Sequence, residues 1–202
     1  MRIIHTLLAV TAAALLGSAA IVAQSVPSKP QAHVPAPANS SSYQALATVH
    51  DLMGAMIDPA SKVVFGAVSS VDTPQGTREK APGSAAEWAV VRQNALLLVE
   101  GANLLLIPGR HIAPPELANV HKEGELPPAE IEVRVAGDRA AWNKLAAGFR
   151  QAAVGAVRAA EAKKPEAFGP VGEAIDTACE NCHLRFWYPE QEQLLKNAPK
   201  PK

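Results

Sequence analysis

The chain has 202 residues, and its 19 Lys or Arg residues balance 19 Asp or Glu residues, so the formal net charge is zero at pH 7. This balance gives no general attraction to nucleic acid or acidic lipid, and it argues against a nucleic-acid-binding function. Hydrophobic residues make up 48% of the chain and alanine is abundant, a composition that favours helices and one ordinary folded domain.

The first 42 residues differ in character from the rest. Residues 1–23 begin with a positive charge at Arg2 and continue as an apolar run with small residues near its end, which is typical of a secretory signal peptide. An uncleaved anchor is the alternative, because residues 3–23 are long and apolar enough to span a bilayer and tether the protein to a membrane. Residues 24–42 are rich in Pro, Ser and Ala and are interpreted as a linker. In both cases we expect the folded part, residues 43–202, to lie in the periplasm.

Helical spacing of apolar residues predicts four amphipathic helices in the folded part. They cover residues 43–68, 84–107, 138–163 and 165–187, with a short helical piece at 190–196. Ser84 and Glu87 have the spacing of a capping box, which marks the start of the second helix. Asp58-Pro59 is expected to kink or restart the first helix. Because no convincing strand pattern is present, the prediction is an all-α fold in which these helices form a bundle.

The apolar stripes of these helices predict which residues are buried. The stripe is Leu46, Val49, Met53, Met56, Ala60, Val63 and Ala67 in the first helix, and Trp88, Val91, Ala95, Leu98, Ala102 and Leu105 in the second. In the third it is Trp142, Leu145, Phe149, Ala153 (or Ala152) and Ala156. Residues 71–83 and the proline-rich residues 110–137 are predicted as loops. The second loop is long for a compact domain, and the pattern assigns it no role.

The two cysteines of the chain stand together in the run Cys179-Glu180-Asn181-Cys182-His183. Two cysteines at this spacing, followed directly by histidine, form the attachment signature of c-type haem. Thiols one helical turn apart can add to the two vinyl groups of one haem, and the adjacent imidazole can then reach the iron from the same side. The motif therefore predicts one covalent haem c per chain, bonded through Cys179 and Cys182 and ligated by His183.

Three other uses of such a cysteine pair have less support. A thioredoxin-like redox site begins a helix in a strand–helix fold, which is not predicted here. A zinc site would need two further ligands, and the chain has no second cysteine pair. A disulfide between residues three apart on a helix would close a very short loop and stabilise little.

With the motif near its carboxyl end and three helices before it, the chain resembles the class II c-type cytochromes, the cytochrome c-prime family and its low-spin relatives, over roughly residues 43–188. The resemblance implies an antiparallel four-helix bundle with haem attached to the last helix, redox proteins as partners, and an antiparallel homodimer in many members. An aromatic residue usually stands three positions after the ligand histidine, and Phe186 matches it as a haem-pocket residue. Trp187 stands where the family usually has a basic residue, and residues 110–137 match no family feature.

The second axial ligand decides the function, and the sequence offers few candidates. No methionine follows His183, and beyond the initiator the chain has only Met53 and Met56, one turn apart in the first helix. The resemblance implies that this helix faces the distal side of the haem, where a methionine binds the iron in low-spin relatives. Met53 is the favoured ligand, with Met56 packing on the ring. Methionine on an apolar stripe is also common as core filler.

Three histidines are weaker candidates for this position. His50 lies near the edge of the first stripe, and His111 and His121 lie in the proline-rich loop, so each is also explained as a surface residue. Without any of these ligands the iron would be five-coordinate, with an open distal site.

We therefore expect a periplasmic electron carrier and not an enzyme, with His183 and Met53 as axial ligands. A soft thioether ligand favours ferrous iron and fills the vacant position, so such a site transfers electrons. The alternative is a high-spin protein that binds nitric oxide or carbon monoxide at an open distal site. A third interpretation is that the protein is the electron-entry subunit of a membrane enzyme, to which an uncleaved segment of residues 3–23 holds it.

Overall fold

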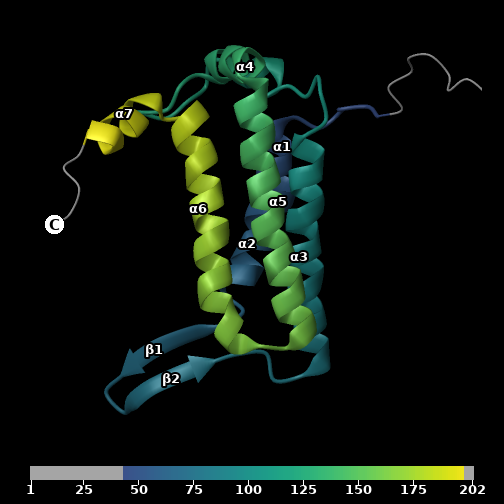
Figure 1. The fold of residues 1–202 in the computed structure, drawn as a ribbon, viewed down its shortest axis with the longest axis vertical. Helices are drawn as coiled ribbons and strands as arrows, with labels where there is room; N and C mark the ends of the chain where they lie inside the picture. Colours follow the sequence, from purple (N-terminus) through teal and green to yellow (C-terminus); the bar gives the residue numbers. More distant parts are fainter. Residues whose placement is uncertain (1–42, 198–202) are drawn as a thin grey trace, which may run out of the picture. The chain divides into compact units, whose positions relative to one another are not determined.

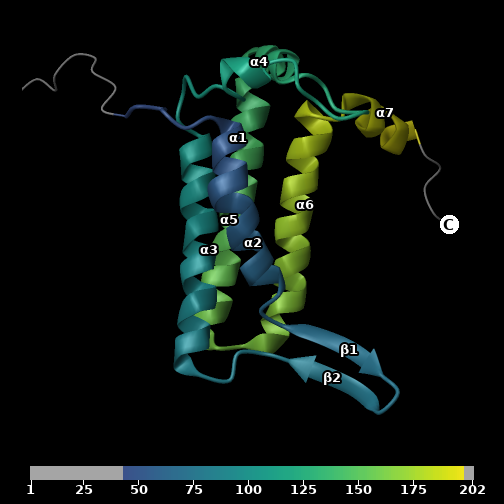
Figure 2. The same cartoon turned by 180° about the vertical axis from the view of Figure 1, so that it is seen from behind.

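The computed structural model describes residues 43–197, and this part of the chain is mostly helical, as the all-α prediction requires (Figures 1 and 2). The predicted signal peptide or anchor (residues 1–23) and the linker (residues 24–42) lie outside the described residues. Among the helices of residues 43–197, none combines the length and the apolar character that a membrane crossing needs.

The helices of the described part run largely side by side (Figures 1 and 2). The helical elements are α1 (Val49–Leu52), the π-helical turn η1 (Met53–Ile57), α2 (Asp58–Phe65), α3 (Ala85–Leu105), the 3₁₀ turn η2 (Pro115–Leu117), α4 (Pro128–Gly137), α5 (Arg139–Ala162), the 3₁₀ turn η3 (Pro165–Ala167), α6 (Phe168–Phe186) and α7 (Pro189–Asn197). α5 packs along both α3 and α6, and η1 and α2 pack against α3. The predicted helices of the second, third and fourth segments are confirmed.

The prediction of a loop over residues 71–83 is wrong in part. Strands β1 (Ser69–Thr73) and β2 (Gly76–Lys80) form an antiparallel hairpin in which Ser69 pairs with Lys80. Nearly every residue of both strands is exposed. Alternation of apolar and polar residues reveals a strand only when one of its faces is buried, and this hairpin buries neither face, so the sequence contains no such signal.

The prediction of a loop over residues 110–137 is also wrong in part. Its last ten residues form α4, which begins at Pro128 and buries Ile131 and Val135. Proline suits the first position of a helix because the missing N–H would have no partner there. Four prolines in this stretch suggested continuous irregular structure, although one of them starts a helix.

The first helix begins later than predicted. Thr48 is its N-cap, since the Thr48 hydroxyl accepts a hydrogen bond from the backbone N–H of Asp51 at 3.2 Å and the Asp51 carboxylate accepts the Thr48 N–H at 2.9 Å. Leu46, the first residue of the predicted stripe, is 84% exposed. Two further free donors of the helix, the N–H groups of Val49 and His50, bond to carbonyls of the loop after α3 at 2.9 Å.

A π-helical turn interrupts this helix at Met53–Ile57, where the backbone N–H of Asp58 donates to the carbonyl of Met53. Pro59 explains the turn. In a continuous α-helix a proline at this position could not donate to the carbonyl of Ala55, and its ring would clash with that carbonyl. The extra residue in the turn avoids this conflict.

The π-turn changes which residues the first helix buries. The predicted stripe contained Met53, Met56 and Val63, and all three are only half-buried. Val49 and Ala60 of the predicted stripe are buried, as is Ala67 just beyond α2, and the other core positions of this helix are Leu52, Ile57 and Val64. The step from Leu52 to Ile57 is five residues, which a regular α-helix cannot place on one face and a π-turn can.

The stripes of the next two helices are confirmed, with one exception. All six predicted residues of α3 are buried, and so are Trp142, Phe149, Ala153 and Ala156 of α5, whereas Leu145 is half-buried. Ala95, Ala102, Ala153 and Ala156 have no exposed surface. Small residues at these positions let the backbones of α3 and α5 approach closely.

Side chains donate hydrogen bonds to the carbonyls at the carboxyl end of α3. The Arg110 guanidinium donates to the carbonyl of Leu104 at 2.9 Å and to that of Ala47, and the Trp142 indole donates to Leu105 at 2.8 Å. Arg139 donates to Leu106 at 2.9 Å. The last carbonyls of a helix have no partner within it, so Trp142 and Arg139 supply donors to the carbonyls of Leu105 and Leu106, and Arg110 adds one to that of Leu104.

Gly101 of α3 is expected to tolerate no side chain. A Cβ at this position would lie 2.8 Å from Cγ1 of Ile57 and 3.5 Å from Sδ of Met56. Gly101→Ala should therefore push the π-turn away from α3 and lower the free energy of unfolding by about 1–3 kcal/mol, the usual cost of overpacking. Urea denaturation followed by circular dichroism measures this change.

The matched control is Gly148→Ala in α5, because nothing lies within 4 Å of a Cβ added there. Removing a glycine from an open helical position should stabilise the protein by about 0.5–1 kcal/mol. Equal effects of the two substitutions would contradict the close approach of α3 to the π-turn.

The capping box at the start of α3 predicts a dependence of stability on pH. The Glu87 carboxylate accepts hydrogen bonds from the N–H groups of Gly83 and Ser84 and from the Ser84 hydroxyl, which lowers its pKa. Its folded pKa is thus below its unfolded value of about 4.3. The stabilisation is present above the unfolded pKa and is lost as the pH falls through the folded pKa. In Glu87→Gln the free energy of unfolding should fall less steeply with decreasing pH than in the wild-type protein. Equal pH dependence of the free energy of unfolding in the two proteins would refute a contribution from Glu87.

Candidate functional site

An apolar cavity of about 230 Å³ lies where the first helix, the end of α3, α5 and α6 meet. Its lining residues are Met53, Ile57, Asp58, Ser61, Leu105, Leu145, Ala146, Phe149, Ala178, Cys179, Cys182 and His183. Both thiols, the imidazole and one thioether of the sequence motifs therefore face a common space. They come from segments more than a hundred residues apart, which only the packing of α6 and the first helix on the same core brings together.

The α-helix explains why three groups of the motif share this wall. Residues three and four positions apart lie on one helix face, so Cys179, Cys182 and His183 all point from α6 into the cavity. Both cysteines are free thiols and half-buried. Glu180, between them in the sequence, is exposed on another side of the helix.

Burial makes these groups neutral. It raises the pKa of the Cys179 thiol to about 11, with a smaller contribution from the carboxylates of Asp176 and Glu180, and it raises that of Cys182 to about 12. It also lowers the pKa of His183, against the opposing charges of Glu180 and Glu125. A neutral imidazole keeps a lone pair for a metal at neutral pH.

Aromatic rings surround His183 at the end of α6. The Trp187 ring lies 5.8 Å from the imidazole and the Tyr188 ring 6.4 Å from it, between ring centroids. The carbonyl of His183 accepts the N–H of Trp187 at 2.7 Å and that of Tyr188 at 3.0 Å. These contacts hold the last turn of α6 and restrict the orientation of the imidazole.

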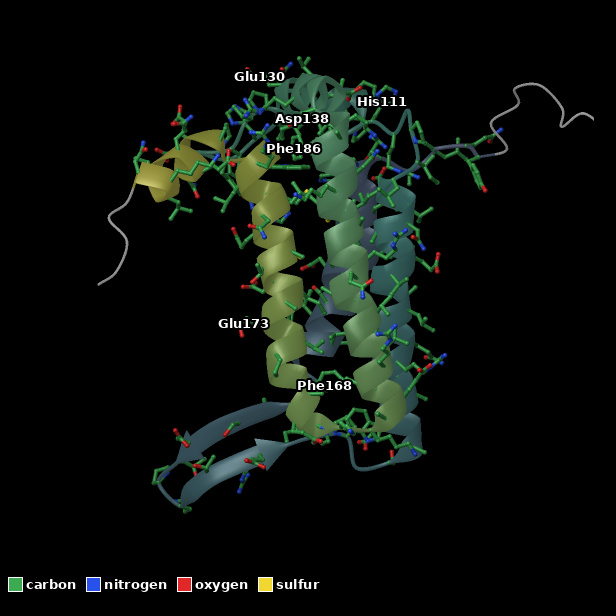
Figure 3. The ribbon with its side chains drawn as sticks, in the orientation of Figure 1. His111, Glu130, Asp138, Phe168, Glu173 and Phe186 are labelled. Carbon is green, nitrogen blue, oxygen red and sulfur yellow. The ribbon has the colours of Figure 1, made fainter. Side chains whose placement is uncertain are left out.

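Phe186 lies beside this site and not in the cavity wall. It is 1% exposed and packs edge-on against Trp142 of α5, with ring centroids 5.5 Å apart. Figure 3 shows Phe186 near the upper end of α6, on the side that faces α5. Its contact with Trp142 fixes α6 against α5 one turn beyond Cys182.

The two methionines of the first helix have different surroundings. Met53 lines the cavity together with His183. Met56 is not among the lining residues, and its Sδ lies 3.5 Å from the Cβ position of Gly101 on α3. Of the two thioethers, Met53 is thus the one that the fold directs toward the cavity.

The weaker histidine candidates lie elsewhere. His50 and His121 are exposed, and His111 Nδ1 lies 2.7 Å from the Glu132 carboxylate. None of the three lines the cavity of Cys179. Within residues 43–197, no three His, Cys, Asp or Glu side chains converge into a metal-binding group.

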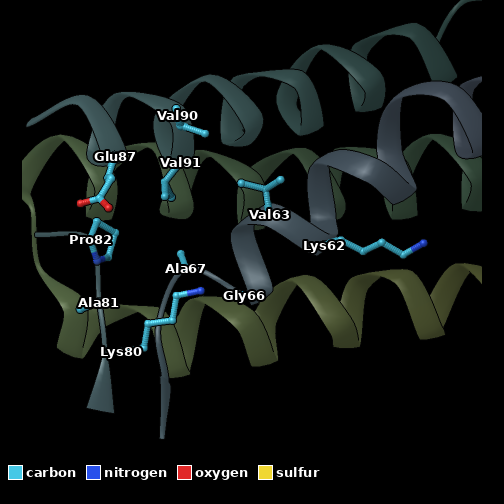
Figure 4. A pocket seen from close by; sticks show the side chains of 10 residues that line it. All are labelled: Lys62, Val63, Gly66, Ala67, Lys80, Ala81, Pro82, Glu87, Val90 and Val91. Atoms are coloured by element: carbon cyan, nitrogen blue, oxygen red, sulfur yellow. The ribbon is translucent and has the colours of Figure 1, made fainter. Parts of the chain in front are cut away.

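A second cavity, of about 440 Å³, lies between α2, the end of β2 and the start of α3 (Figure 4). Charged residues at its edge include Lys62, Lys80 and Glu87. The described residues that line it include no cysteine, histidine or methionine. This second cavity therefore offers no sulfur or imidazole donor.

The donor set of that cavity fits a covalently attached haem. Cys179 and Cys182 could form thioethers, His183 offers a neutral imidazole, and Met53 offers a soft thioether from another wall. The rest of the wall is apolar apart from Asp58 and Ser61. Comparison of the chain with protein-family models, curated proteins and solved structures found no match.

Several wall residues have no signal in the sequence. Ile57 and Leu105 look like ordinary core residues of two helices, and Leu145 and Ala178 like members of apolar stripes. Their shared position depends on the π-turn and on the packing of α3, α5 and α6, neither of which a local pattern encodes.

The neutral thiols predict slow alkylation of the folded, haem-free chain. Thiols react as thiolates, so at pH 8 Cys179 should react with iodoacetamide about two orders of magnitude more slowly than free cysteine, and Cys182 about three orders more slowly. Cys182, whose pKa is about 12, should react more slowly than Cys179, whose pKa is about 11. Mass spectrometry of timed samples measures both rates, with urea-unfolded protein as the control. Rapid modification of the folded chain would contradict the burial of the motif.

Proposed function

We propose that this protein is an exported, periplasmic c-type cytochrome that carries single electrons between redox proteins. In this proposal α1–α2, α3, α5 and α6 form an antiparallel four-helix bundle, with one haem attached to α6. The observation that carries the proposal is the convergence of His183, Met53 and both thiols on one apolar cavity.

Each of these side chains has a separate role. Cys179 and Cys182 retain the cofactor by two thioether bonds. His183 is the proximal ligand, since burial favours its neutral imidazole, which packs against the rings of Trp187 and Tyr188. Met53 is the distal ligand from the first helix. When bound, the haem supplies one-electron redox chemistry, and its potential depends on the axial ligands, the nearby charges and the burial of the site.

The apolar wall supports electron transfer in preference to chemistry on a substrate. Ile57, Leu105 and Phe149 line the cavity with apolar side chains. The polar groups of the wall are Asp58 and Ser61, on the α2 side, where the Asp58 carboxylate pairs with Lys62 at 2.7 Å. A soft thioether in these surroundings favours the ferrous state and occupies the distal position.

The test compares two methionines one turn apart. The full chain is matured with haem in the periplasm, and covalent attachment is confirmed by haem staining after denaturing electrophoresis. Wild-type protein and Met56→Ala should both show low-spin spectra without rapid binding of carbon monoxide. Met53→Ala should become high-spin in the ferrous state and bind carbon monoxide at once, because it loses the distal ligand.

Other results would change the assignment. A high-spin wild-type spectrum that shifts with carbon monoxide would indicate an open distal site and gas binding. Loss of the low-spin spectrum in Met56→Ala but not in Met53→Ala would exchange the roles of the methionines. Absence of covalent haem from wild-type protein would refute the proposed function.

A further inference from the structure

We propose that Glu125, held by Tyr188, is a positioning and charge-bearing residue on the proximal side of the haem that lowers the midpoint potential of the protein. This inference rests on the proposed haem site at His183. It assigns a role to part of the proline-rich segment that precedes α4, for which the sequence pattern indicated none.

The structure fixes the Glu125 carboxylate from two sides. The Tyr188 hydroxyl donates to Oε1 at 2.8 Å, and the backbone N–H of Lys122 donates to Oε2 at 3.3 Å. The next residue, Leu126, donates its N–H to the carbonyl of Trp187 at 3.0 Å. The segment around Glu125 is thus bonded to the residues that directly follow α6, and its charge has a defined position.

Tyr188 connects this carboxylate to the ligand histidine. Its ring is perpendicular to the His183 imidazole, at 89° and 6.4 Å between centroids, and its N–H donates to the His183 carbonyl at 3.0 Å. The Tyr188 hydroxyl is a neutral phenol, since burial and the bond to Glu125 raise its pKa to about 12. Glu125 therefore lies one aromatic side chain away from the proximal imidazole.

The remaining charges near His183 do not cancel that of Glu125. Arg185, two residues from His183, pairs with Asp138 at 2.6 Å and approaches Glu192 at 3.8 Å. Glu180, on the preceding turn of α6, adds a second negative charge, which is exposed to solvent. The carboxylates of Glu180 and Glu125 both favour a positive charge at His183, that of Glu180 more strongly, and of the two Glu125 is the half-buried one.

A negative charge near the proximal ligand stabilises the form of the site with the larger positive charge. Loss of one electron adds a positive charge to the haem, so Glu125 favours the oxidised state and lowers the potential. A partly buried charge is screened less by salt than an exposed one. The thioether of Met53 acts in the opposite direction, and the two groups together would set the potential.

The experiment is a spectroscopic redox titration of the full, haem-loaded chain. Glu125→Gln removes the charge and keeps the size of the side chain, so the midpoint potential should rise. Glu125→Asp keeps the charge and should remain closer to wild type. Glu123→Gln is the control, because it removes an exposed charge from the same segment. Its shift in midpoint potential should be smaller and should vanish in about 1 M salt, where the screening length is about 3 Å. The shift in midpoint potential of Glu125→Gln should persist in that salt.

Two results would overturn the inference and leave the proposed function standing. One is a Glu125→Gln potential equal to that of wild type or of Glu123→Gln. The other is equal shifts in Glu125→Gln and Glu125→Asp, which would indicate a structural role without a charge effect. Absence of covalent haem from wild-type protein would overturn both proposals.

Discussion

Pro59 imposes the constraint on which the arrangement of the site depends. Because proline has no backbone donor and would clash with the preceding turn, the first helix contains a π-turn at Met53–Ile57. The turn directs Ile57 into the core against Gly101 and leaves Met53 on the wall of the cavity. One extra backbone residue thus decides which of two methionines faces His183.

The segment between α3 and α4 closes one end of the molecule. Its carbonyls accept the first free N–H groups of α1, Arg110 binds the carbonyl of Leu104 in the last turn of α3, and Leu126 bonds to the residue after α6. Three helix ends that would otherwise expose unpaired polar groups are therefore satisfied by one stretch of chain. This stretch holds the first helix and α6 at the separation that the cavity between them needs.

The site separates its neutral donor groups from most of the nearby charges. Burial favours the neutral forms of Cys179, Cys182 and His183, the carboxylates of Glu180 and Glu125 act on His183 from outside the lining, and Asp58 in the lining pairs with Lys62. A redox centre placed here would be kept from water while nearby charges adjust its potential. The proposed electron transfer and the proposed role of Glu125 both follow from this separation of neutral and charged groups.

The sequence by itself determined the helices of α3, α5 and α6, since their apolar period and caps are local, and it determined that Cys179, Cys182 and His183 share one helix face. It also favoured Met53 over Met56 as the ligand, although both lay on one predicted apolar stripe and their different surroundings were not predicted. Tertiary structure decided that distinction, together with the exposed hairpin, α4 and the contact of Glu125 with Tyr188. One reason is that a π-turn breaks the 3.6-residue period on which local patterns depend. The other is that contacts between distant segments follow from packing, which no local pattern contains.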